Sequence, residues 1–290
     1  MATNLNKRPW QLFALITTLS WGIWGAFIEL PEKNGFPATL GYVVWALTMI
    51  PCALVALALV NWQLDRDPRS IFLGSVIGFT GAGGQLILFQ ALREGPAYIV
   101  FPVISLYPVV TIFLSMLLLR ERASRRGAWG IAIALVAMVL LSYTTPTGAQ
   151  SRGYWWLLLA IIVFFCWGVQ AYFMKSANNS MQAESIFFYM TITGLLLIPV
   201  AWFMTDFSQP VNRGLNGPWL AAGIQLLNAI GALTLVYALR YGKAIIVVPV
   251  TALAPVITII ISLILYSVVP HPITMVGLLL AAIAIYLMAE

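Results

Sequence analysis

The chain has 290 residues, of which 61% are hydrophobic and only 8% are charged, and its mean hydropathy is +0.94. An ordinary soluble domain carries roughly 25% charged residues, so the composition excludes most soluble folds and predicts an all-α integral membrane protein. The net charge of +6 would by itself allow a nucleic-acid partner, but the positions of the charges argue against one.

Nine charge-free runs divide the chain, and each of the first eight is long enough for one helix of the ~20 residues that span a bilayer. In chain order they are residues 9–28, 34–64, 70–92, 95–119, 127–151, 153–174, 185–205, 214–239 and 244–289. The last run holds two helices, because the proline-flanked segment 268–272 divides it. The sequence therefore predicts ten membrane helices.

The basic residues predict how these helices are oriented. With both termini in the cytoplasm, eleven of the 15 Lys and Arg residues fall on the cytoplasmic side: Lys7, Arg8, Arg66, Arg69, Arg120, Arg122, Arg125, Arg126, Lys175, Arg240 and Lys243. The outer side receives Lys33, Arg93, Arg152 and Arg213. Because Lys and Arg near helix ends resist translocation, the basic charge predicts a multi-pass protein of the cell (inner) membrane, with no nucleic-acid partner.

An internal repeat runs through the chain. Residues 91–115 and 238–262 are identical at 15 of 25 positions at a constant offset of 147. Toward the N-terminus the offset becomes 146, and Trp21-Gly22 falls on Trp167-Gly168. We predict two five-helix units, 1–149 and 150–290, with residues 144–151 as the link.

Five helices are an odd number, so the second unit enters the membrane from the opposite side. The result is a 5+5 inverted-topology repeat, which can exchange inward-open and outward-open shapes around a site near the midplane. Duplication without alternating access, in a membrane scaffold or an accessory subunit, is the alternative.

The repeated segments resemble a known family. The pattern A-L-R-x-G-x-A before a proline-containing helix, and the segment LLLRERASRRGAWGIAIALVAMVLL at residues 117–141, are similar to the EamA domain of the drug/metabolite transporter superfamily, here in two tandem copies. The second unit departs from the pattern, because Val268 stands where the first has Glu121. The resemblance implies a secondary transporter that exports amino acids, related metabolites or amphipathic compounds. The segment WGIWGAFIELPEKNGFPATLGY at residues 21–42 resembles glucose/ribose porters of the same superfamily, so uptake of a neutral sugar is a second possibility.

Polar residues inside apolar helices are functional candidates, because they are costly in hydrocarbon. Gly78, Gly81 and Gln85 share one helix face, and their equivalents Gln225, Asn228 and Ala232 share another. Either these stripes line a common cavity or they pack helices together. A second pair of faces carries Trp21 and Trp24 in the first unit and Trp167 and Gln170 in the second; these would suit a flat or amphipathic ligand or form packed core.

Two helix-end charges also correspond. Glu29 ends the face of Gly22 and Gly25, and Lys175 ends the equivalent face. Glu29 is a candidate for coupling a proton or another cation, and Lys175 for anchoring a substrate carboxylate. The alternative is that both simply reach water at the interface.

Four prolines complete the candidate set, because each removes a backbone donor inside a predicted helix and predicts a kink that can act as a hinge: Pro102, Pro108, Pro249 and Pro255. The only histidine, His271, lies between prolines, so a metal site or a histidine-based catalytic triad has no support. We therefore expect a transporter and not an enzyme, with no cofactor. Its expected partners are a small-molecule substrate and the lipid bilayer, and a proton or another ion is a candidate for coupling.

Overall fold

The computed structural model describes residues 9–143, 154–266 and 271–288, and within these ranges every regular element is helical. In chain order the elements are α1 (Pro9–Phe27), α2 (Glu29–Lys33), α3 (Ala38–Leu59), α4 (Pro68–Glu94), α5 (Ala97–Ser105), α6 (Tyr107–Leu118), α7 (Arg125–Leu141), α8 (Trp155–Ala177), α9 (Ala183–Leu196), α10 (Ile198–Phe203), a π-helical turn η1 (Leu215–Trp219), α11 (Leu220–Tyr241), α12 (Ala244–Thr251), α13 (Pro255–Tyr266) and α14 (Pro272–Met288). The predicted link 144–151, and Lys7, Arg8, Arg152, Val268 and Pro270, lie outside the described residues.

Eight helical segments of the described ranges are long and apolar enough to cross a membrane. They are Pro9–Lys33, Ala38–Leu59, Pro68–Glu94, Ile99–Leu118, Trp155–Ala177, Ala183–Phe203, Leu215–Tyr241 and Ala244–Ile264. Helices α7 and α14 are shorter, with 17 residues each. The prediction of an all-α, multi-pass membrane chain is thus confirmed, whereas ten crossings in a 5+5 inverted topology remain a prediction.

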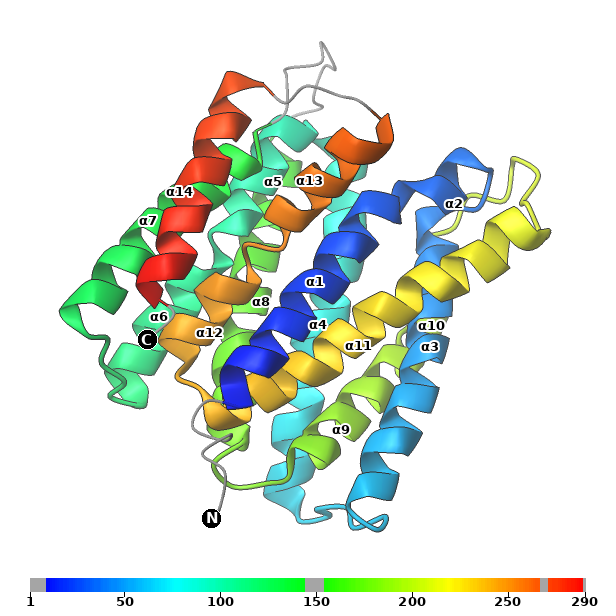
Figure 1. The fold of residues 1–290 in the computed structure, drawn as a ribbon. Helices are drawn as coiled ribbons and strands as arrows, with labels where there is room; N and C mark the ends of the chain where they lie inside the picture. The colour runs from blue at the N-terminus through cyan, green and yellow to red at the C-terminus, as the bar shows by residue number, and fades with distance from the viewer. Residues whose placement is uncertain (1–8, 144–153, 267–270, 289–290) are drawn as a thin grey trace, which may run out of the picture.

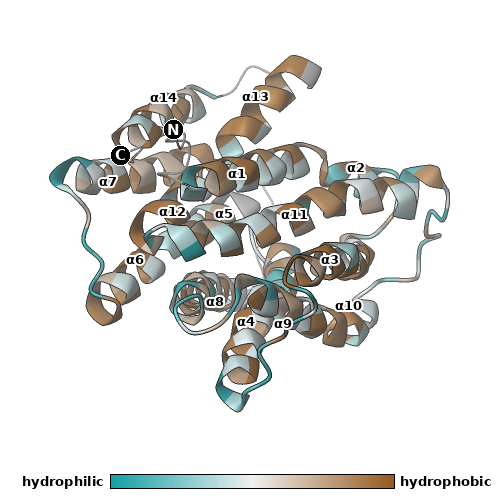
Figure 2. Cartoon of the chain, turned by 60° about the horizontal axis from the view of Figure 1, so that its bottom comes forward, coloured by the Kyte–Doolittle hydropathy of each residue, from teal (hydrophilic) through white to brown (hydrophobic). Residues whose placement is uncertain are grey.

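The outer surface of the bundle is apolar. Figure 2 shows mainly hydrophobic residues along the helices and hydrophilic residues at several of the connections. Large side chains such as Phe72, Trp129 and Leu279 are about two-thirds exposed. Such a surface would aggregate in water and is suited to lipid chains.

The helices pack in matched pairs across the two halves of the chain. Helix α1 packs on α11 as α8 packs on α4, and α1 meets α13 as α8 meets α6. Helices α7 and α14, which are equivalent in the repeat, lie side by side (Figure 1). Most of the helix packing therefore joins one half to the other, with fewer contacts inside each half.

One pair of hydrogen bonds shows how closely these contacts correspond. Thr258 Oγ1 donates to Gly22 O over 2.8 Å, and Thr111 Oγ1 donates to Gly168 O over 2.8 Å. Thr111 and Thr258 are 147 residues apart, and Gly22 and Gly168 are 146 apart. The offsets found in the sequence thus describe equivalent places in the fold.

The repeated prolines coincide with helix breaks. In the first half the chain leaves α5 at Ser105 and starts α6 at Tyr107, with Pro102 inside α5 and Pro108 in the first turn of α6. In the second half α12 ends at Thr251 and α13 begins at Pro255. A further break between α9 and α10 precedes Pro199, whereas its equivalent Pro51 lies inside the continuous α3.

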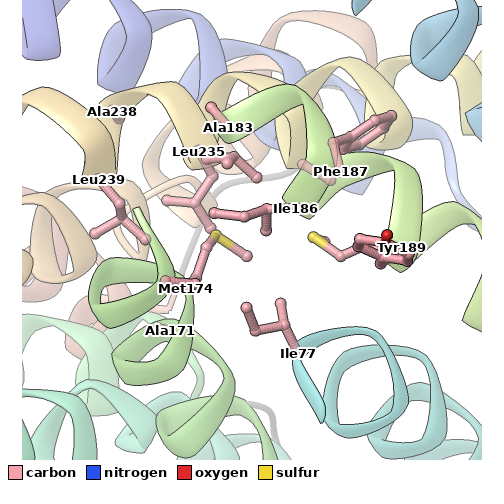
Figure 3. Close-up of a cluster of buried hydrophobic side chains, with 14 of the residues drawn as sticks. Ile77, Ala171, Met174, Ala183, Ile186, Phe187, Tyr189, Leu235, Ala238 and Leu239 are labelled. Carbon is pink, nitrogen blue, oxygen red and sulfur yellow. The ribbon is translucent and has the colours of Figure 1, made fainter. Parts of the chain in front are cut away.

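A buried hydrophobic cluster fills one end of the bundle. Figure 3 shows Ile77 of α4, Met174 of α8, Ile186 of α9 and Leu235 of α11 pointing toward one another. Residues of α9 such as Phe187 are fully buried there. We call this cluster the plug, because it closes one end of the cavity described below.

The glutamate that marks the first unit caps a helix of the second. Glu121 Oε1 and Oε2 accept hydrogen bonds from the backbone N–H groups of Ala244 and Ile245, each over 3.1 Å. These N–H groups open α12 and have no partner within the helix, and a carboxylate also complements the positive end of the helix dipole.

We expect Glu121→Ala to lower the free energy of unfolding by about 1–2 kcal/mol, because it removes this cap. The measurement is denaturant unfolding of the purified protein in detergent. Arg122→Ala is the matched control, because Arg122 is exposed and only its backbone carbonyl accepts a bond, from Lys243. Equal stability of the two variants would contradict the capping role.

Candidate functional site

A central cavity opens at one end of the bundle and consists of two adjoining chambers. The mouth chamber has a volume of about 640 Å³, and the deep chamber has about 500 Å³. They share the lining residues Trp24, Ile28, Glu29, Trp45, Gln85, Phe101 and Asn228. Met174 and Leu235 both line the deep chamber and belong to the plug, so the cavity ends where the plug begins.

The deep chamber is lined by equivalent residues of the two halves. Trp21 and Trp167 both line it, as do Trp24 and its equivalent Gln170. Further equivalent pairs on its wall are Gly25 with Ala171, Ile28 with Met174, Gly81 with Asn228, Gln85 with Ala232, Phe101 with Val248, and Tyr107 with Ala254. The chamber therefore lies where the two halves meet, with similar backbone and different side chains on its two sides.

Two tryptophans hold the crossing helices in place around this chamber. Trp21 Nε1 donates to Asn228 O over 3.3 Å, and Trp167 Nε1 donates to the equivalent carbonyl, Gly81 O, over 3.4 Å. Both bonds join a helix of one half to a helix of the other. These indoles are thus both part of the wall and part of the helix packing, which were the two alternatives open from the sequence.

Three side-chain amides face the deep chamber. Gln85 of α4, Gln170 of α8 and Asn228 of α11 all line it. Among the described residues none of them makes a side-chain hydrogen bond. An amide without a partner beside an open chamber is free to bond a ligand, because each carries both donors and an acceptor.

The fourth amide is already engaged. Trp24 Nε1 donates to Gln225 Oε1 over 3.1 Å, and this bond joins α1 to α11 at the boundary between the chambers. Gln225 is buried and lines only the mouth chamber. All seven residues proposed from the sequence as a binding set therefore line the cavity, while their role in binding stays a prediction.

The charged residues lie at the mouth. Glu29, Glu32, Arg93 and Asp206 line the mouth chamber, and Glu29 alone of the charged residues also borders the deep chamber. Glu29 Oε2 pairs with Lys33 Nζ at 2.7 Å, and both side chains are about two-thirds exposed. Hydrogen bonds from Ser208 keep the pKa of Asp206 below its usual range.

Lys175 lies elsewhere. Its Nζ donates to Leu239 O over 2.9 Å and to Gly242 O over 2.7 Å, at the C-terminal end of α11. It lines neither chamber. The structure thus places this ammonium on a helix end, where it complements the negative end of the dipole, and a carboxylate-anchoring role gains no support from its position.

The hinge candidates lie beside the deep chamber. Pro255 and its neighbour Ala254 line it, as does Tyr107 at the start of α6. The helix breaks are therefore at the depth of the chamber, where backbone without helical partners is tolerated. Motion about these prolines stays a prediction.

Several lining residues were not identified from the sequence. Trp45 and Met49 of α3 face both the cavity and α9. Their equivalents Thr193 and Leu197 do not line the cavity, so the repeat could not have identified them as lining residues. Phe101 and Tyr107 could have been found, because both they and their equivalents line the deep chamber.

Comparisons with known proteins agree with one another. A model of the EamA-like transporter family matches residues 8–143 and again 154–289. The chain is 24% identical to protein RarD of Streptomyces exfoliatus over 267 residues, covering 87% of this chain and 77% of RarD. It is 24% identical to protein LicB of Haemophilus influenzae over 210 residues, covering 69% of this chain and 70% of LicB.

A third relative and a solved structure bear on the architecture. An uncharacterised protein of Methanocaldococcus jannaschii, MJ1333.1, is 28% identical over 132 residues, which are 45% of this chain but 94% of the relative. One of the two repeats is therefore a protein of its own there. A crystal structure with 17% sequence identity matches with a TM-score of 0.79 over 97% of this chain and 96% of its own, which shows a shared fold.

Proposed function

Because the chain belongs to the EamA-like transporter family of the drug/metabolite transporter superfamily, we propose that it is a secondary-active transporter that moves a small organic metabolite by alternating access. The single observation that carries this proposal is the cavity at the meeting of the two repeats, open at one end and plugged at the other. Inverted repeats around a central site are suited to exchanging their shapes.

The difference between the two ends supports such an exchange. Phe89 and Leu92 of α4 line the open mouth, whereas their equivalents Val236 and Leu239 of α11 are fully buried. Equivalent segments thus line the cavity at one end and are packed against other helices at the other. If both termini lie in the cytoplasm, as the basic residues predict, the mouth faces the outside of the cell membrane.

The cargo class proposed first is amino acids, related metabolites or amphipathic compounds, moved outward. Indoles and free amides in one chamber suit a ligand with an apolar face and polar groups. A second candidate is a neutral sugar, moved inward. It is favoured by the deep chamber, where no charged side chain other than Glu29 is present among the lining residues. On either proposal the chain carries a substrate through lipid and catalyses no reaction.

The test is flux in proteoliposomes, with labelled amino acids and labelled neutral sugars offered separately, with and without a pH gradient. We expect saturable flux of one class well above that of protein-free vesicles, because a gated cavity has a finite number of sites. Gly223→Leu serves as a variant control, since Gly223 is exposed and a Cβ added there meets no atom within 4 Å. Absence of saturable flux and of ligand-dependent thermal stabilisation for both classes would reject both cargo proposals and favour a non-transporting scaffold.

A further inference from the structure

The mouth and the plugged end differ in how α1–α2 and α8 meet the neighbouring helix. At the plugged end α8 continues to Ala177 and holds two donors against α11. Lys175 Nζ donates to Leu239 O and Gly242 O, and Asn178 Nδ2 donates to Val236 O over 3.1 Å. Both donors bond backbone carbonyl oxygens near the C-terminal end of α11. Leu239 O and Gly242 O have no helical partner of their own, whereas Val236 O lies one turn earlier, inside the helix.

The equivalent positions at the mouth are acidic. At the offset of 146, Glu29 falls on Lys175 and Glu32 falls on Asn178. At the offset of 147, the carbonyls of Phe89, Leu92 and Gly95 on α4 fall on those of Val236, Leu239 and Gly242 on α11. The sequence thus places two carboxyl groups where the plugged end has two donors.

The surroundings of the two corners otherwise correspond. Trp10 packs on Gly242 at the plugged end, and the equivalent Trp156 packs on the equivalent Gly95 near the mouth. The corners differ because Pro31 has no N–H group to donate to Phe27 O. The helix is interrupted between Phe27 and Glu29, and α2 departs from the course of α1 (Figure 1). Its equivalent, Ala177, continues α8.

We propose that the mouth closes by bringing α2 against the C-terminal end of α4, as α8 lies against α11, and that this closure requires protonated Glu29 and Glu32. An ionised carboxylate only accepts hydrogen bonds, whereas a protonated carboxyl also donates one. Carbonyl oxygens at a helix C-terminus carry partial negative charge, so they repel the ionised form and bond the protonated form. Acid on the mouth side therefore favours the closed mouth.

Several charged groups lie around α2 while the mouth is open. Lys33 on α2 itself pairs with Glu29, and Arg93 of α4 and Asp206 after α10 line the same chamber. The three elements that pack on α2, namely α1, α3 and η1, carry no charged residue. Arg93 Nη2 donates to Met204 O over 2.7 Å, and its equivalent at the plugged corner, Arg240, likewise donates from Nη1 to a backbone carbonyl, Met181 O, over 3.5 Å.

This inference rests on the proposed alternating access but adds a separate device. The protons come from water at the mouth and return there when the mouth reopens, so they set the pH dependence of closure and are not carried across the membrane. The ratio of closed to open mouths is expected to rise by up to about tenfold per unit of falling pH for each carboxyl that takes up a proton.

The experiment measures the width of the mouth directly. Spin labels at Asn34 on the α2 side and Gln90 on α4, in a background with Cys52→Ala and Cys166→Ala, report the distance by pulsed electron paramagnetic resonance in lipid nanodiscs. Between about pH 8 and about pH 5 we expect the population with the short distance to grow. Glu29→Gln/Glu32→Gln should hold the short distance at both pH values, because an amide donates without a proton from solvent.

Two further variants make the outcome decisive. Glu29→Lys/Glu32→Asn copies the plugged end and should also close the mouth at both pH values. Asp206→Asn removes a mouth carboxylate whose equivalent, Ala58, is not a donor, and should keep the wild-type response. A wild-type distance that does not change with pH, or that shortens as pH rises, would overturn the proposal, as would glutamine variants that respond like the wild type. If acid closes the mouth but no compound shows flux, the cargo proposals are rejected and the pH-dependent closure stands. If a compound shows flux but acid does not close the mouth, the closure proposal is rejected and the transport proposal stands.

Discussion

Replacing Asn228 by leucine is expected to weaken ligand-dependent stabilisation strongly while leaving the folded protein intact. The amide of Asn228 lines both chambers and bonds no other side chain of the described residues, so its loss breaks no internal contact. A ligand group that bonded it would be left unsatisfied in a chamber closed by the plug. Such a loss costs about 1–3 kcal/mol, or roughly 5- to 150-fold in affinity.

The measurement is the shift in melting temperature on adding whichever compound shows flux, compared with Leu226→Ala on the outward face of the same helix. Gln85→Leu and Gln170→Leu are expected to act in the same direction, because their amides face the deep chamber from α4 and α8. If all three leucine variants kept the full ligand response, the free amides would not belong to the binding site.

Gly168→Leu is expected to have the largest effect on folding. A Cβ at Gly168 would lie 2.4 Å from Val110 Cβ and 2.7 Å from Tyr107 O, and a Cβ at the equivalent Gly22 would lie 2.4 Å from Ile257 Cβ. One of the atoms in the way at Gly168 is backbone, so α8 and α6 must separate. Overpacking of this kind costs about 1–3 kcal/mol or more, and the Thr111 bond to Gly168 O would lengthen as well.

The measurement is the yield of monodisperse protein and its unfolding midpoint in detergent. Gly223→Leu is the matched control, because it adds the same side chain to an exposed glycine of α11 that has open space around it. We expect the Gly168 variant to lose most of its folded yield and the Gly223 variant to keep it. Equal yields would mean that the α6–α8 contact adapts, and that the close approach is not required.

The sequence by itself determined the membrane class, the helix positions and the correspondence between the halves. Long charge-free runs require helices in lipid, since no water is present to satisfy backbone groups. The offsets of 146 and 147 can be found from the sequence alone. Residues related by these offsets occupy equivalent places in the fold, as the equivalent hydrogen bonds of Thr111 and Thr258 show. The repeated prolines likewise predicted where two helices break.

Only the tertiary structure decided which of these residues face a cavity and which end of it is open. Helical spacing places Gln85, Gln225 and Asn228 on helix faces, but it does not say whether a face meets space or another helix. The structure shows that Gln225 is bonded to Trp24, whereas the side-chain amides of Gln85 and Asn228 make no hydrogen bond to any described residue. The two halves, whose sequences match only in part, also take different conformations. The plug of one end and the mouth of the other depend on contacts between segments far apart in the chain, such as Lys175 with Gly242 O, 67 residues apart, and Glu121 with Ala244 N, 123 residues apart. Such contacts are a property of packing, and no local pattern of residues encodes them.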